Sequence, residues 1–352
     1  MPAVPRCLLV RASLALLLAA AGAAQAEPAY RAHEVLAPEG GPPLRPYAIN
    51  NTGSVAGNTE DPDNYLLKDS FTLRPRGPYV SFQPFGATYS QAYGINDLGD
   101  IVGYAMQPTN DMAYLKPAGQ PAIALFPADG SVIGSYAWGV NASQQVVGNF
   151  VTADNHHHAF SWKDGVVTQL PSLGGKFDYA GAVNASGVIA GGSRRLSRRA
   201  HNHAVKWVNG ALVDLGGLGY TDVGGDGTYA INDAGWVAGY CSVANFQIHG
   251  CLWHDGVIDD LPPLVAGSWG EVRAINDHKV AVGRAGDPNS LDHAVIWKNG
   301  VVSDLNQQVA LPAGVVLEVA QSINDKGRIL AQGYDRLQDR ERHFVLVPVA
   351  TP

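Results

Sequence analysis

Short apolar runs alternate with turns rich in Gly and Asn along most of the chain. One phrase, an apolar pair followed by Asn, ends such a run at Asn50, Asn96, Asn141, Asn184, Asn232, Asn276 and Asn324. The spacings between these residues are 46, 45, 43, 48, 44 and 48, which is the size of one blade of a β-propeller. The runs lack a 3.6-residue period, so the pattern predicts short strands and almost no helix.

Each repeat contains four predicted strands. The first ends in the Asn phrase, and a tight turn such as 232–235 leads to a second strand that ends in Gly. A loop of variable length precedes the third strand, as at 203–207 or 293–297. A second tight turn, such as 298–300, leads to the fourth strand at 301–305. We therefore expect the two tight turns of each repeat on one face and the variable loops on the other.

The order of strands at the two ends of the chain predicts a closed ring. Residues 30–36 match the fourth strand of a repeat, and residues 343–349 match the third. Pairing of these two strands would complete the last repeat and hide the sheet edges that an open array exposes. The sequence thus predicts an all-β fold: a seven-bladed β-propeller of four-stranded blades, closed by pairing of the N- and C-terminal strands. The Asn strand would be innermost.

The first 26 residues have the features of a cleaved signal peptide. Arg6 and Arg11 precede a short apolar run, and Ala24 and Ala26 form a small-x-small cleavage site. We expect residues 27–352 to be a single β-propeller repeat domain that is secreted or periplasmic. The apolar run is too short for a permanent anchor, so no membrane anchor is expected.

The charge balance argues against general binding to nucleic acid or to an anionic membrane. The chain has 24 basic and 31 acidic residues, and loss of Arg6 and Arg11 with the signal peptide makes the mature protein more acidic still. We therefore expect no nucleic-acid partner. Cys241 and Cys251 remain after cleavage and fall on consecutive strands of one repeat. An exported protein permits a disulfide, and we expect the two residues to lie directly opposite each other; two free thiols are the alternative.

The repeat resembles a known family. His158-Ala-Phe-Ser-Trp162, followed by Leu173-Gly-Gly175 and Ala182-Val-Asn184, is similar to the HAF repeat of probable extracellular bacterial proteins. Residues 203–239 match in the same way, 249–253 and 293–297 are looser copies, and the first two repeats lack the His and Trp. The resemblance implies an exported repeat protein. It brings no catalytic residues and no cofactor.

The starts of the predicted inner strands carry the most structured candidate site. Three residues before the Asn stand Tyr47, Tyr93, Trp138, Tyr229 and Arg273, with Gly181 and Gln321 in the two other repeats. Aromatic and polar groups around a channel mouth suit a sugar, whose flat faces stack while its polar edges form hydrogen bonds. The alternative is ordinary packing of aromatic rings between neighbouring blades.

Two further groups of residues could bind ions. Arg194, Arg195, Arg198 and Arg199 form a basic run in a variable loop, where an anion could dock, or where the arginines could pair with neighbouring acids. Histidines recur on the third strands, at His158, His203, His249, His293 and His343. They fall in separate repeats and cannot converge on one ion, so we interpret them as structural, with hydrogen bonds to backbone, and expect no metal site and no cofactor.

Catalytic motifs are absent from the sequence, including nucleophile elbows, zinc-protease motifs and phosphate-binding loops. The favoured interpretation is an exported, non-catalytic binding scaffold that presents a ligand surface on the variable-loop face, for carbohydrate or a protein partner. A propeller enzyme acting on polysaccharide, as a glycoside hydrolase or lyase, is the alternative, and a purely structural repeat is a third. The enzyme hypothesis requires acidic and basic groups to converge in one pocket, chiefly Glu271, Asp226, Asp222, Arg45 and Arg273.

Overall fold

The computed structural model describes residues 29–349, except 62, 65, 76, 128, 197–200, 220–224, 245–246, 288 and 290. The expected signal peptide, residues 1–26, lies outside the described residues. Within the described part the chain is all-β: it contains no α-helix, and short 3₁₀ turns occur at η1 (Pro84–Gly86) and η3 (Leu305–Gln307).

Three separate four-stranded sheets follow the predicted order, each strand antiparallel to the next. They comprise β2 (Leu44–Ile49), β3 (Val55–Thr59), β4 (Ser70–Leu73) and β5 (Tyr79–Phe82); β18 (Gly227–Ile231), β19 (Val237–Ser242), β20 (Ile248–His254) and β21 (Val257–Leu261); and β22 (Gly270–Ile275), β23 (Ala281–Gly286), β24 (Asp292–Lys298) and β25 (Val301–Asp304).

Twelve strands between the first and second of these sheets form one hydrogen-bonded assembly. Three antiparallel groups within it are linked by single parallel pairs, Asp111 with Gly134 and His157 with Phe177. The groups are β6 (Ser90–Ile95), β7 (Ile101–Met106), β8 (Asp111–Lys116) and β9 (Ile123–Ala124); β10 (Gly134–Val140), β11 (Val146–Val151), β12 (His157–Lys163) and β13 (Val166–Gln169); and β14 (Gly174–Val183), β15 (Ile189–Arg195), β16 (Asn202–Val208) and β17 (Ala211–Asp214).

The two ends of the chain meet in a fifth sheet. Its strand order is β26–β1–β29–β28–β27, so the N-terminal strand β1 pairs antiparallel with the C-terminal strand β29. Tyr30 lies opposite Pro348 and Glu34 opposite Phe344. The strands of this sheet are β1 (Tyr30–Glu34), β26 (Val309–Ala310), β27 (Val315–Ile323), β28 (Ile329–Asp335) and β29 (Arg340–Pro348).

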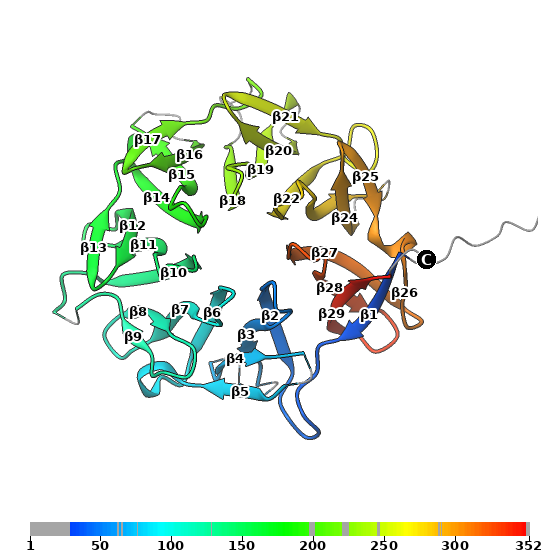
Figure 1. Cartoon of the computed structure of the whole chain (residues 1–352), viewed down its shortest axis with the longest axis horizontal. Helices are drawn as coiled ribbons and strands as arrows, with labels where there is room; N and C mark the ends of the chain where they lie inside the picture. Colours follow the sequence, from blue (N-terminus) through cyan, green and yellow to red (C-terminus); the bar gives the residue numbers. More distant parts are fainter. Residues whose placement is uncertain are drawn as a thin grey trace, which may run out of the picture.

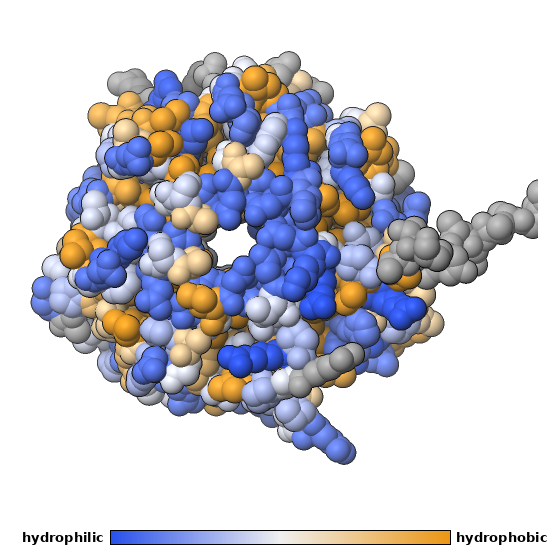
Figure 2. Space-filling view, in the orientation of Figure 1, coloured by the Kyte–Doolittle hydropathy of each residue, from blue (hydrophilic) through white to orange (hydrophobic). Residues whose placement is uncertain are grey.

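The sheets are arranged around a central opening (Figure 1), and the strands nearest the centre are those that end at the recurrent Asn: β2, β6, β10, β14, β18, β22 and β27. The space-filling view shows the same opening, with hydrophilic residues along much of its rim (Figure 2). Radial repetition of short antiparallel sheets defines this fold as β-propeller-like.

The recurrent asparagines bind one another around this opening. The Asn50 side-chain amide donates to the backbone carbonyl of Asn96 at 2.8 Å, and each later Asn donates likewise to the next at 2.8–3.2 Å. The last of these bonds runs from Asn324 back to Asn50. The aspartates that directly follow some of these asparagines add further hydrogen bonds between neighbouring sheets. For example, Asp277 accepts a hydrogen bond from the backbone N–H of Asp233. The aspartates of these turns therefore link neighbouring sheets.

The core lies between neighbouring sheets and depends on tryptophans of the third strands. Trp207 packs with Val147, Ala159 and Leu170 of the preceding sheet, and its Nε1 donates to the carbonyl of Pro171 at 2.8 Å. Close approach of the strands also explains the recurrent Gly. A Cβ on Gly191 would overlap the carbonyl oxygen of Tyr179, next to the bulge between Ala180 and Ala182.

Candidate functional site

A cavity of about 720 Å³ occupies one end of the central opening. Its lining includes the five residues predicted at the starts of the inner strands: Tyr47, Tyr93, Trp138, Tyr229 and Arg273. Each comes from a different strand, β2, β6, β10, β18 and β22. The fold therefore brings together residues that are up to 226 positions apart in the sequence.

One side of the cavity is an aromatic arc, defined here as Tyr47, Tyr93 and Trp138. Ring centroids lie 5.4 Å apart for Tyr47 and Tyr93 and 4.6 Å apart for Tyr93 and Trp138. The Trp138 indole donates to Oδ1 of Asn149 at 2.8 Å, which fixes the orientation of the ring. Burial raises the pKa of Tyr93, so its hydroxyl stays protonated. The rings pack on one another and still present surface to the cavity.

The opposite side is a charged arc, defined here as Arg273, Arg284, Asp292 and Glu318. Behind it Glu271, with 4% of its side chain exposed, forms an ion pair with Arg273 Nη2 at 2.5 Å and accepts a hydrogen bond from Arg284 Nε at 2.6 Å. Arg284 Nη1 also binds Asp292 at 2.8 Å. Two arginines thus compensate the buried carboxylate of Glu271, as a buried charge requires.

Two buried polar atoms of the residues that line the cavity have no partner among the described residues and could bind a ligand. The Arg273 guanidinium lies 4.6 Å from the centre of the Tyr229 ring, while its buried Nε has no hydrogen-bond partner in the described part of the chain. Gln321, another lining residue, has a buried Oε1 that is also unpartnered there. Burial and the negative charge of Asp292 raise the pKa of Glu318.

Sequence reasoning missed a second series of lining residues. Asn149, Arg284 and Gln332 all line the cavity, and all stand eight residues after the recurrent Asn, on the second strand of their sheets. The same position holds Tyr104 and Tyr240 in two other repeats. The variety of polar and aromatic residues at this position could have revealed the second series from the sequence. A position that only packs between sheets would hold similar apolar residues in every repeat.

The basic run does not form one open patch in the described residues. Arg195 Nη2 pairs with Asp214 at 2.6 Å, and Arg194 donates to Asn202 at 2.8 Å while its guanidinium lies 5.0 Å from the centre of the Phe177 ring. Phe177 lines the central cavity, so Arg194 stands beside the aromatic side of the site. Arg198 and Arg199 lie outside the described residues.

The residues that an enzyme at the channel mouth would need do not all converge. Glu271 and Arg273 meet, but Arg45 does not line the cavity and pairs with Glu60 and Glu341 at 3.3 and 2.5 Å. Asp226 is buried elsewhere, where its carboxylate accepts from the Ser242 backbone N–H, and burial raises its pKa. Asp222 lies outside the described residues.

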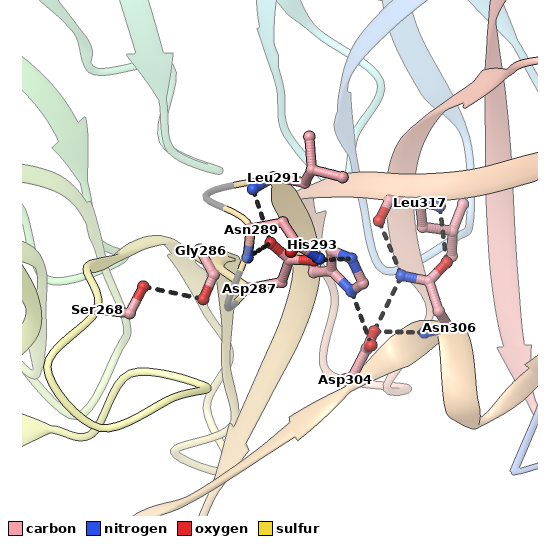
Figure 3. A network of polar contacts seen from close by, with 9 residues as sticks. All are labelled: Ser268, Gly286, Asp287, Asn289, Leu291, His293, Asp304, Asn306 and Leu317. Atoms are coloured by element: carbon pink, nitrogen blue, oxygen red, sulfur yellow. Dashed lines mark hydrogen bonds and ion pairs between the residues drawn. The ribbon is translucent and has the colours of Figure 1, made fainter.

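The recurrent histidines bind the fourth strand of their own sheet, not the backbone as expected. His249 lies 2.9 Å from Asp260 and His293 lies 2.8 Å from Asp304. His293 also faces Asp287 at 3.8 Å, in the network that Asn306 extends to Leu317 (Figure 3). These contacts anchor strand to strand within a sheet, which supports a structural role.

The assignment of His343 to this series was wrong by one residue. Arg342 lies opposite Gly333, nine residues after its Asn, as His203 lies opposite Ser193. Arg342 binds Glu34 of β1 (Nε to Oε1, 2.9 Å), so an Arg–Glu pair replaces the His–Asp pair where the chain ends meet. A slip of one residue turns a strand's side chains to the other face, and His343 is accordingly buried.

Cys241 and Cys251 form a disulfide with their Cα atoms 5.8 Å apart. They are not directly opposite, because Cys241 pairs with His249 and Cys251 with Gly239. The bond therefore joins diagonal neighbours on β19 and β20.

In the part of the chain that the structure describes, no three or more His, Cys, Asp or Glu side chains form a group that could hold a metal ion. A helix long and apolar enough to span a bilayer does not occur in that part either.

The fold and the cavity define an all-β, β-propeller-like protein with an amphipathic central cavity. No family model matches the sequence, and no curated protein matches it. Among solved structures, a puromycin-hydrolyzing peptidase of Mycobacterium tuberculosis is similar with a TM-score of 0.54 at 13% identity, over 85% of this chain and 52% of that one. An acylaminoacyl peptidase of Pyrococcus horikoshii has a TM-score of 0.50 at 12% identity, over 83% and 48%.

TolB from Acinetobacter baumannii is also similar, with a TM-score of 0.46 at 11% identity, over 83% of this chain and 63% of that one. The chain spans about half the length of the two peptidases. At these identities the likeness concerns the fold alone.

Proposed function

We propose that this chain is a secreted or periplasmic, seven-bladed β-propeller of the HAF-repeat kind, and that its central cavity binds carbohydrate without transforming it. The blade count is supported by the series of asparagine bonds that returns from Asn324 to Asn50, and ring closure by the pairing of β1 with β29. The Cys241–Cys251 disulfide is consistent with an oxidising compartment.

The observation that carries this proposal is the division of one cavity into an aromatic arc and a charged arc. The C–H faces of a sugar ring stack on Tyr and Trp, while its hydroxyl groups need a dense set of fixed donors and acceptors. The aromatic arc offers the first, and Asn149, Arg273, Gln321 and Glu318 offer the second. A volume of about 720 Å³ falls in the range of small-molecule sites.

The test is binding of residues 27–352 to a panel of oligosaccharides and polysaccharides, measured by calorimetry and by affinity electrophoresis. We expect Trp138→Ala to weaken binding about tenfold, since an aromatic stacking surface is lost. Trp236→Ala is the matched control, because Trp236 stacks on His254 and does not line the cavity. Absence of binding to every sugar, or equal loss in both variants, would refute the site and turn the search to a protein partner on the variable-loop face.

A second candidate, a propeller enzyme acting on polysaccharide, is favoured by one observation. Glu318 and Asp292 both line the cavity, and glycoside cleavage uses a pair of carboxyl groups; burial raises the pKa of Glu318, the direction that suits a general acid. Incubation of each bound polysaccharide with the protein, followed by analysis of the reducing ends, separates the two functions. New reducing ends that disappear in Glu318→Gln would establish an enzyme, and unchanged polysaccharide would leave a binding protein.

A further inference from the structure

Four tryptophans fill the same slot between neighbouring sheets. Each lies opposite the first residue of the second strand of its own sheet, in the pairs Val146–Trp162, Ile189–Trp207, Val237–Trp253 and Ala281–Trp297. The tryptophans are 1–7% exposed, so the indoles complete the junction with the preceding sheet. Three of them donate Nε1 to a backbone carbonyl at 2.8–3.0 Å.

Leu73 takes the place of the tryptophan where the terminal strands meet the first sheet. It lies opposite Val55, the first residue of β3, just as Trp207 lies opposite Ile189. A groove of about 520 Å³, named here the seam groove, lies at this junction. Its apolar lining consists of Val35, Val55, Leu73, Val345 and Val347. Leu73 is smaller than the indole that stands at this position in four of the sheets, and Lys116 and Leu346 stand there in two others.

The charges beside the seam groove are mainly positive. Arg74 and Arg328 line it, and neither forms an ion pair with a carboxylate of the described residues. Arg328 is held against Gly53, because its guanidinium occupies the space that a Cβ at Gly53 would need. The acidic residue of the lining, Glu34, is already bound by Arg342. An anion is therefore complementary to the groove.

We propose that the seam groove binds a small aromatic carboxylate, with its ring in the position of the missing indole and its carboxylate beside Arg74 and Arg328. The apolar walls suit a flat ring of indole size, and a guanidinium recognises a carboxylate through charge-assisted hydrogen bonds. This site lies apart from the central cavity and does not depend on the function proposed for it, since the two linings share no residue.

The test is calorimetric titration of residues 27–352 with indole-3-acetate, and with tryptamine as a cation of the same ring. We expect binding of indole-3-acetate alone. Leu73→Trp should abolish it by filling the slot, whereas Leu98→Trp, which adds the same side chain at a 60% exposed position, should leave it unchanged. The double variant Arg74→Gln with Arg328→Gln should weaken binding about tenfold or more.

The proposal would be overturned by absence of binding to the unchanged protein, by equal binding of tryptamine, or by full binding to Leu73→Trp or to the Arg double variant. Thermal unfolding of each variant confirms that it is folded, and the Arg double variant tests the site even if Leu73→Trp does not fold. Trp138→Ala should bind indole-3-acetate normally. Loss in that variant would place the ligand in the central cavity instead and would also refute the seam site.

Discussion

At the scale of single residues, burial of His343 lowers the pKa of its imidazole. The residue lies on β29 with 5% of its surface exposed, and its Nδ1 has no hydrogen-bond partner in the described part of the chain. Burial, with a smaller contribution from the positive charge of Arg45, lowers its pKa from 6.5 to about 4, although Glu34 acts in the opposite direction. The imidazole is therefore neutral in the folded protein at neutral pH.

This shift predicts the acid sensitivity of the fold. Between about pH 6.5 and pH 4 the unfolded chain binds a proton that the folded chain does not, so the free energy of unfolding falls as the pH falls through this window. The loss attributable to His343 is about 3 kcal/mol at most. Urea denaturation of His343→Leu across this range should show a flatter pH dependence than the unchanged protein. Parallel curves would contradict the assignment.

At the scale of the element, the recurrent Asn serves both its own turn and the neighbouring sheet. The Asn232 side-chain oxygen accepts the Trp236 backbone N–H at 2.9 Å, which caps the turn between β18 and β19. Its amide donates to the Asn276 carbonyl at 3.0 Å in the next sheet. An Asp could cap the turn but could not donate, so the second bond explains why Asn stands at this position in every repeat.

Asn232→Ala should therefore destabilise the protein by about 2–3 kcal/mol, since it leaves a half-buried N–H and a buried carbonyl without partners. Chemical denaturation measures the change. Asn289→Ala is the matched control, because Asn289 is exposed in a loop and its side-chain amide donates to Asp287 of the same loop, and we expect a change below about 0.5 kcal/mol. A similar, small effect of both substitutions would show that the bond between sheets contributes little.

At the scale of the whole molecule, β1 holds the two ends of the chain together. Its backbone pairs with β29 over five residues, and Glu34 accepts from Arg342, which also binds Asp335. Without β1 the edge of β29 would be exposed to solvent, and an exposed edge invites pairing with other chains.

A chain that begins at residue 37 should consequently unfold at a lower temperature than residues 27–352 and should self-associate. Calorimetry and light scattering measure the two effects. A chain that begins at residue 29 keeps β1 and serves as the control. If the chain from residue 37 stays monomeric with an unchanged unfolding temperature, the pairing of the chain ends does not stabilise the molecule.

The sequence by itself determined the period, the order of strands within a repeat, the innermost position of the Asn strand and the convergence of Tyr47, Tyr93, Trp138, Tyr229 and Arg273. These features follow from local turn chemistry and from a repeat whose equivalent residues must occupy equivalent places. When the sheets are arranged around a central opening, residues at the same point of each inner strand meet there.

Only the tertiary structure decided the pairing register and the full composition of the cavity. The sequence His-Phe-Val at 343–345 resembles the third-strand motif, but the pairing of β28 with β29 places Arg342 at the position that a histidine occupies in other repeats. Cross-strand register also sets the cysteines diagonally and brings Arg284 and Asn149 of the second strands into the cavity. Alternation along one strand carries no information about its alignment with the next, so these contacts depend on how whole strands pack.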